Sequence, residues 1–242
     1  MTTVLLIRHG RTEANTAGIL TGRTPGVELD AFGLNQVTEV GQRIGPIALK
    51  AIVSSPLRRC RQTAQALQAG RTDGLTAEVE EELVECGYGD WSGRSLKDLS
   101  KEKLWATVQQ QPSAVRFPGG ESMVEMSARA VGAIRAWDQR LNDEHGEEAV
   151  WVAVSHGDVI KAILADALGV HLDSFQRILV DPASISIVRY TPVRPYVVTL
   201  NSTTAELSSL FRPPGKKART RRIKNPHDAP VGGGLGAEEA IE

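Results

Sequence analysis

Short apolar runs alternate along the chain with longer stretches in which apolar residues recur every three or four positions. The short runs cover residues 4–7, 51–53 and 149–154. Continuous apolar runs of this length are typical of strands that helices bury on both faces. Two later apolar stretches, residues 185–190 and 196–200, are predicted as further strands.

Apolar residues with helical spacing lie between these runs and predict helices near residues 34–44, 95–109, 122–141 and 159–168. In the first of these helices, Leu34 is expected on the apolar face. Ser122 and Glu125 have the spacing of a capping box, and Gly169 follows the last helix where a C-terminal glycine is expected. Strands that alternate with helices predict a layered α/β fold.

The length of 242 residues and the 41% of hydrophobic residues suit one α/β domain over residues 1–204. Beyond it the composition changes, with paired prolines, three consecutive glycines, and seven basic residues without an acidic one between Arg212 and Lys224. We predict that residues 205–242 form a flexible tail, first basic and then acidic.

The formal net charge of −1 indicates no nucleic-acid or membrane partner for the whole molecule. Only the basic stretch of the tail could bind nucleic acid or anionic lipid. Two cysteines do not indicate a disulfide framework, and no apolar run reaches transmembrane length. A soluble, cytoplasmic protein is therefore expected.

Histidines and arginines follow the three predicted buried strands. His9 comes after the first, the Arg58-Arg59 pair after the second, and His156 after the third. Ligands of α/β folds bind beyond the carboxyl ends of the strands, so these side chains are expected to converge there.

Such a cluster suits phosphoryl transfer, which needs a nucleophile, cations for the phosphoryl oxygens and an acid for the leaving oxygen. His9 is the candidate nucleophile, and Arg8 could clamp two oxygens with its planar fork. Arg59 and His156 would supply further donors. Glu85, in a loop with three glycines, a tyrosine and a tryptophan, is the candidate acid. A metal site on His9 and His156 is an alternative, but no nearby spacing completes its ligands.

These residues resemble the histidine phosphatase superfamily, which contains phosphoglycerate mutase, over roughly residues 3–200. One position departs from the family pattern, because Ser92 stands where a glutamate is common. The matching blocks are Arg8-His9-Gly10-Arg11-Thr12 with Asn15, Thr21-Gly22-Arg23, residues 55–64, residues 85–93, residues 118–122 and residues 154–157.

The resemblance implies a phosphoglycerate mutase-like fold, a three-layer αβα sandwich around a mostly parallel sheet. It implies a phosphohistidine on His9, no metal and no other cofactor, and a small phosphorylated substrate. The oligomeric state stays open, with a homodimer among the alternatives. The implied site residues are His9, Arg8, Arg59 in preference to Arg58, His156 and Glu85 for catalysis, and Asn15, Thr21 and Gly22 for substrate binding.

Hydrolysis and mutase activity would share this phosphoenzyme and differ only in the group that accepts the phosphoryl group. Mutases similar to the glycolytic enzyme carry an insertion with paired arginines after the acid-bearing loop. The corresponding span here is short and holds no adjacent arginine pair. We therefore expect a metal-independent phosphomonoesterase. A phosphomutase is the first alternative, and a non-catalytic phosphate-binding or interaction protein, with the tail as its partner-binding part, is the second.

Overall fold

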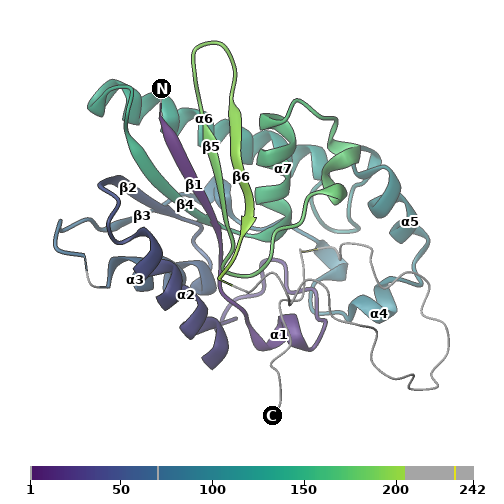
Figure 1. The fold of residues 1–242 in the computed structure, drawn as a ribbon. Coiled ribbons are helices and arrows are strands. Elements are labelled where there is room, and N and C mark those ends of the chain that lie inside the picture. Colours follow the sequence, from purple (N-terminus) through teal and green to yellow (C-terminus); the bar gives the residue numbers. More distant parts are fainter. Residues whose placement is uncertain (1, 70, 205–231, 233–242) are drawn as a thin grey trace, which may run out of the picture.

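In the computed structural model, which describes residues 2–69, 71–204 and 232, a sheet of six strands crosses the domain (Figure 1). Its order is β3-β2-β4-β1-β5-β6. The first four of these are parallel, and β5 and β6 are antiparallel to their neighbours. The expected mostly parallel sheet is thus confirmed. The strands are β1 (Thr3–Arg8), β2 (Leu49–Ser54), β3 (Ala77–Val79), β4 (Val150–Ser155), β5 (Ile185–Arg189) and β6 (Tyr196–Ser202).

Helices cover both faces of the sheet. Side chains alternate between the faces of a strand, so Leu5 and Ile7 pack with α2 and α3, while Val4 and Leu6 pack with α6 and α7. This double burial explains the continuous apolar runs and confirms the three-layer αβα sandwich. The α-helices of the described chain are α1 (Glu13–Thr16), α2 (Ala31–Ile44), α3 (Arg58–Gln68), α4 (Leu96–Leu99), α5 (Lys103–Gln110), α6 (Met123–His145) and α7 (Gly157–Ala167).

The helix ends follow local sequence signals. The Asp30 side chain caps α2 by accepting a hydrogen bond from the Gly33 backbone, and the predicted capping box of Ser122 and Glu125 begins α6. Leu34 was expected on the apolar face of α2, which is wrong, since it is 46% exposed. The buried face of that helix consists of Gly33, Val37, Val40 and Ile44.

The single helix predicted near residues 95–109 is also wrong. Two short helices, α4 and α5, occupy this span, and residues 100–102 separate them. Leu96 and Leu99 are three residues apart, but the next apolar residue, Leu104, comes five positions later. Residues five positions apart do not lie on the same face of a helix. Leu104 and Val108 can therefore be buried together with Leu96 and Leu99 only if a second helix begins in a different direction.

The predicted tail, residues 205–242, lies outside the described residues except for Gly232. Cys60 and Cys86 are both buried and free. Within the described ranges, no helix is long and apolar enough to cross a membrane.

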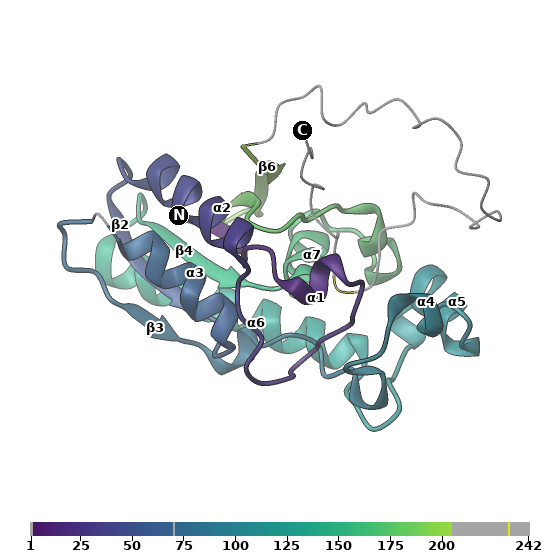
Figure 2. The same cartoon turned by 90° about the horizontal axis from the view of Figure 1, so that it is seen from below.

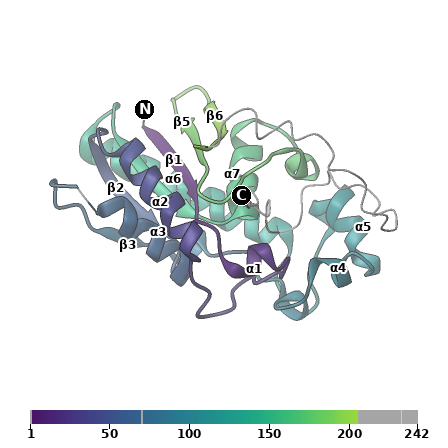
Figure 3. The same cartoon turned by 60° about the horizontal axis from the view of Figure 1, so that its bottom comes forward.

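The carboxyl ends of the parallel strands meet at one end of the sheet. Figure 1 shows β1 running from the N-terminus down to α1, so this end faces the bottom of that view. Figure 2 looks onto it from below, with α1 between the α2–α3 pair and the α4–α5 region. The intermediate view in Figure 3 shows the same order.

Candidate active site

Three chain segments bring His9, Arg59 and His156 to this end of the sheet. His9 directly follows β1, and its backbone N–H donates to the Ser155 carbonyl at the end of β4 (3.0 Å). Arg59 lies in the first turn of α3, after β2, and His156 is the N-cap residue of α7. The convergence expected from the strand ends is therefore present.

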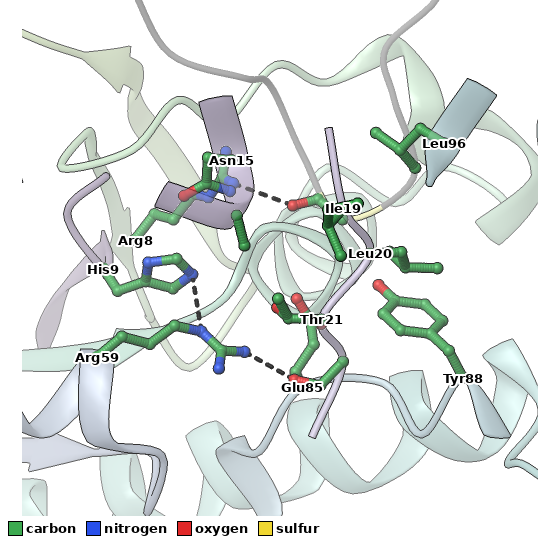
Figure 4. Close-up of a pocket in the computed structure, with 13 residues that line it drawn as sticks. Arg8, His9, Asn15, Ile19, Leu20, Thr21, Arg59, Glu85, Tyr88 and Leu96 are labelled. Carbon is green, nitrogen blue, oxygen red and sulfur yellow. Dashed lines mark hydrogen bonds between the residues drawn. The ribbon is translucent and has the colours of Figure 1, made fainter. Parts of the chain in front are cut away.

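The His9 imidazole is held as a neutral ring with a defined orientation. Its Nδ1 lies 2.7 Å from the Gly10 carbonyl oxygen, to which it donates, and its Nε2 accepts from Arg59 Nε at 3.2 Å (Figure 4). Burial lowers the pKa of His9 well below its usual value, and the positive charges of Arg59 and Arg8 lower it further. The Nε2 atom therefore carries no proton of its own near neutral pH.

Arg59 connects the two histidines. Its Nη2 donates to the Gly22 carbonyl at 2.8 Å and to His156 Nδ1 at 3.1 Å. Its Nη1 is buried and has no hydrogen-bond partner among the described residues. The neighbouring Arg58 side chain is 60% exposed and pairs with Glu28 at 3.1 Å. Arg59, and not Arg58, thus offers an open donor to an anion.

His156 contacts Arg59 but is fully buried and is not among the residues that line the pocket. Because the Arg59 guanidinium can only donate, Nδ1 of His156 accepts, and Nε2 donates to Ser55 Oγ at 2.7 Å. The two histidine rings lie 5.3 Å apart between centroids. Burial, followed by the charge of Arg59, lowers the pKa of His156 well below its usual value.

Arg8 lies fully buried beside His9. Its Nη1 donates to the Val180 carbonyl at 2.8 Å, and its Nη2 donates to the Gly232 carbonyl at 3.1 Å. Burial lowers the pKa of Arg8, while nearby carboxylates, that of Glu85 foremost, counteract this effect. Two buried guanidinium groups, Arg8 and Arg59, make the pocket suitable for a phosphoryl dianion.

Glu85 faces the same pocket and is 4% exposed. Burial raises its pKa to about 7, and the negative charge of Asp158 contributes to the rise. The Glu85 carbonyl oxygen accepts from Arg23 Nε at 2.8 Å and from Arg129 Nη2 at 3.2 Å. These contacts hold a carboxyl group that can be protonated near neutral pH.

The three predicted substrate-binding residues, Asn15, Thr21 and Gly22, also line the pocket. Asn15 Oδ1 accepts hydrogen bonds from the backbone N–H and hydroxyl of Thr12, both at 2.9 Å. The amide N–H groups of Asn15 therefore remain as donors. The alternative metal site on His9 and His156 lacks further ligands, because no group of three or more His, Cys, Asp or Glu residues in the described chain could hold a metal ion.

Sequence reasoning missed three residues at this site: Tyr88, Asp158 and Gly232. Tyr88 and Gly232 line the pocket, and Asp158 hydrogen-bonds to both. Tyr88 stands in the acid-bearing loop and Asp158 directly follows the His156-Gly157 pair. Their positions were therefore a usable signal, whereas nothing near Gly232 in the sequence indicated a site.

We expect Arg59→Lys to lower kcat/KM roughly 10²- to 10³-fold, the usual effect of removing one preorganised donor. A lysine cannot donate to Gly22, His156 and a phosphoryl oxygen with one planar group. Arg58→Lys is the matched control and should stay within about threefold of the wild type, since that side chain pairs with Glu28 outside the pocket. Steady-state kinetics on both variants test this prediction, and equal losses would contradict it.

The layered α/β fold and a pocket of His9, two arginines and a buried carboxyl group, with His156 bonded to Arg59 behind it, define a class of phosphoryl-transfer proteins. Comparisons with known proteins identify the family. Residues 4–203 match the family model of the histidine phosphatase superfamily (branch 1). The chain belongs to this superfamily and is a phosphoric monoester hydrolase by class.

Proteins named for several different phosphorylated substrates are similar to this chain. Phosphoserine phosphatase 1 of Hydrogenobacter thermophilus is 28% identical over 208 residues, which is 84% of this chain and 93% of the relative. A protein named probable phosphoglycerate mutase GpmB, from Proteus mirabilis, is 32% identical over 194 residues, 78% of this chain and 86% of the relative. The crystal structure of phosphoserine phosphatase from Entamoeba histolytica, in complex with 3-phosphoglyceric acid, is similar with a TM-score of 0.74 and 26% identity, covering 84% of this chain and 98% of that one.

Proposed function

We propose that this protein hydrolyses a small phosphomonoester through a phosphohistidine on His9. The observation that carries the proposal is the shared pocket of a neutral imidazole, a buried Arg59 Nη1 without a partner in the described chain, and a buried carboxyl group with a pKa near neutrality. These are the nucleophile, the anion donor and the acid that the reaction needs.

In the first step, His9 Nε2 attacks the phosphorus atom and the bond to the ester oxygen breaks. The Glu85 carboxyl group gives its proton to the leaving oxygen, so an alcohol departs and Glu85 becomes a carboxylate. The hydrogen bond from Arg59 Nε to His9 Nε2 must give way, and the guanidinium then donates to the phosphoryl oxygens. Arg8 lines the same pocket, and His156 accepts the hydrogen bond that holds Arg59 Nη2 in place.

In the second step, water attacks the phosphorus atom and the bond to Nε2 breaks. Glu85, now a carboxylate, takes a proton from the attacking water and returns to its first state. Phosphate leaves, and His9 is again a neutral ring. A residue that titrates near neutral pH suits both roles, because it can give and take the proton.

A small phosphorylated substrate is supported by the relatives, which are named for phosphoserine and glucosyl-3-phosphoglycerate. The mutase alternative rests on the similarity to the Proteus mirabilis protein. Against it, the span between the acid-bearing loop and residue 118 forms the short helices α4 and α5 and contains no adjacent arginine pair. We therefore propose water as the acceptor.

The experiment is to incubate the protein with phosphoserine, 3-phosphoglycerate and other small phosphomonoesters in the presence of a chelator. We expect phosphate release and, after an alkaline quench, a phosphoryl group on the His9 peptide by mass spectrometry. Phosphorylation elsewhere, or turnover without a phosphoenzyme, would contradict the proposal. With 3-phosphoglycerate and 2,3-bisphosphoglycerate, isomerisation faster than phosphate release would favour the mutase.

A further inference from the structure

A second buried carboxylate lies beside the pocket, and the proposed chemistry does not use it. Asp158, in the first turn of α7, is fully buried. Its Oδ2 accepts a hydrogen bond from the Tyr88 hydroxyl at 2.7 Å and another from the backbone N–H of Gly232 at 3.0 Å. Both donors line the pocket. Oδ2 of Asp158 is thus one hydrogen bond away from the lining of the pocket.

A buried negative charge next to a phosphate pocket is unfavourable unless a partner offsets it. Lys161 Nζ lies 3.5 Å from Asp158 Oδ1, and is itself buried and bonded to Gln176 at 3.0 Å. This ion pair involves Oδ1, whereas Tyr88 and Gly232 both donate to Oδ2. Oδ2 still requires donors, because an ionised carboxylate can only accept.

Gly232 bridges Asp158 and Arg8 across the pocket that it lines. Its N–H donates to Asp158, and its carbonyl oxygen accepts from Arg8 Nη2 at 3.1 Å. The pocket that remains has a free volume of about 30 Å³, which is room for one or two water molecules and not for a phosphomonoester. A substrate must therefore displace Gly232. A phosphoryl oxygen can replace its carbonyl on Arg8, but Asp158 Oδ2 then loses a donor.

We propose that Asp158 selects the leaving group by accepting a hydrogen bond from it, in the position that the Gly232 N–H now holds. The inference rests on the proposed function and names its substrate class. The substrate is a phosphomonoester that carries an ammonium or hydroxyl donor beyond the ester oxygen. An ester without such a donor would leave a buried carboxylate oxygen with one hydrogen bond fewer, which is costly.

The test compares 2-aminoethyl, 2-hydroxyethyl and n-propyl phosphate, which differ only in a terminal ammonium, hydroxyl or methyl group. The same three esters with one more methylene group, 3-aminopropyl, 3-hydroxypropyl and n-butyl phosphate, place the terminal group farther from the ester oxygen. For the wild type we expect kcat/KM of the ammonium and hydroxyl esters to exceed that of the methyl ester by about 10- to 100-fold. Equal kcat/KM for all esters would overturn the inference, while phosphate release would still support the proposed function. Failure to hydrolyse any ester, together with no phosphoenzyme, would overturn the proposed function itself.

Variants of Asp158 test whether this residue causes the preference for esters with an ammonium or hydroxyl group. Asp158→Asn keeps the shape and removes the charge, so the preference for ammonium over methyl should fall about tenfold. Asp158→Leu combined with Lys161→Met replaces the buried ion pair by apolar side chains of similar size and should remove the preference for both donors. Ratios between esters are compared because an altered Glu85 pKa affects all esters alike. Thermal melting curves confirm folding, and unchanged ratios in both variants would contradict the role of Asp158.

Gly232→Val separates Asp158 from the glycine that now contacts it. Gly232 has a φ of +84°, where valine is strained, and an added Cβ would lie 3.2 Å from Leu20 Cδ1. The variant should weaken the Gly232 contact and lower KM for all esters, with the ratios between esters unchanged. Loss of the donor preference in this variant would show that it came from Gly232 and not from Asp158.

Discussion

Replacing His9 by alanine is expected to lower kcat for phosphomonoester hydrolysis by roughly 10⁴- to 10⁶-fold and to abolish the phosphoenzyme. The reason is that Nε2 of His9 is a neutral ring nitrogen held towards the pocket by the bond from Nδ1 to the Gly10 carbonyl. Water alone would have to attack the phosphorus atom in the variant. Phosphate-release kinetics and mass spectrometry after an alkaline quench measure both effects.

The matched control is His145→Ala, at the C-terminal end of α6, where the ring is 36% exposed and lies 3.9 Å from Glu144. This variant should keep wild-type turnover, since its ring contacts no residue of the pocket. If His9→Ala retained full turnover and a normal melting curve, the nucleophile would be another group. A binding function would gain support only if the wild type itself released no phosphate.

Replacing Glu85 by glutamine should lower kcat roughly 10²- to 10⁴-fold for alkyl phosphates. Their alkoxide leaving groups need a proton, which glutamine cannot supply. The loss should be much smaller for p-nitrophenyl phosphate, whose leaving group departs without protonation. Glu81→Gln is the matched control, because Glu81 lies four residues earlier and is exposed.

The pH dependence gives an independent test of Glu85. Burial raises the pKa of its carboxyl group to about 7, and the first step needs the protonated form. Wild-type kcat for alkyl phosphates should therefore fall as pH rises through about 7, provided the first step limits the rate. In Glu85→Gln this alkaline decline should disappear. A decline that persists in the variant would assign the titration to a different group.

Much of the fold could be predicted because a strand that is buried on both faces has a continuous run of apolar residues. Residues 4–7, 51–53 and 149–154 are apolar without alternation, and each forms a central strand of the sheet. The short strand β3 was not predicted, since its residues Ala77–Val79 lie at the sheet edge and are mostly exposed. The split between α4 and α5 was not predicted, because apolar residues continue through residues 96–108 and only the five-residue interval from Leu99 to Leu104 marks the break.

The choice between Arg58 and Arg59 could not be predicted from the local pattern of residue types. Adjacent residues on a helix point in directions about 100° apart, so only one of them can face the pocket. The residue types are identical, and the family resemblance alone favoured Arg59. The structure places Arg59 between His9 and His156 and leaves Arg58 at the surface.

The layered fold and the residue types at the strand ends can be predicted from the chain alone, because strand burial and helix periodicity are local properties of the chain. The folded structure was needed to show that Asp158 contacts two residues that line the pocket, that its charge acts on Glu85, and that Gly232 lies between Asp158 and Arg8. Gly232 and Arg8 are 224 positions apart. Contacts between residues so far apart in the sequence depend on how the layers pack. The hydrophobic periodicity of the chain does not predict them.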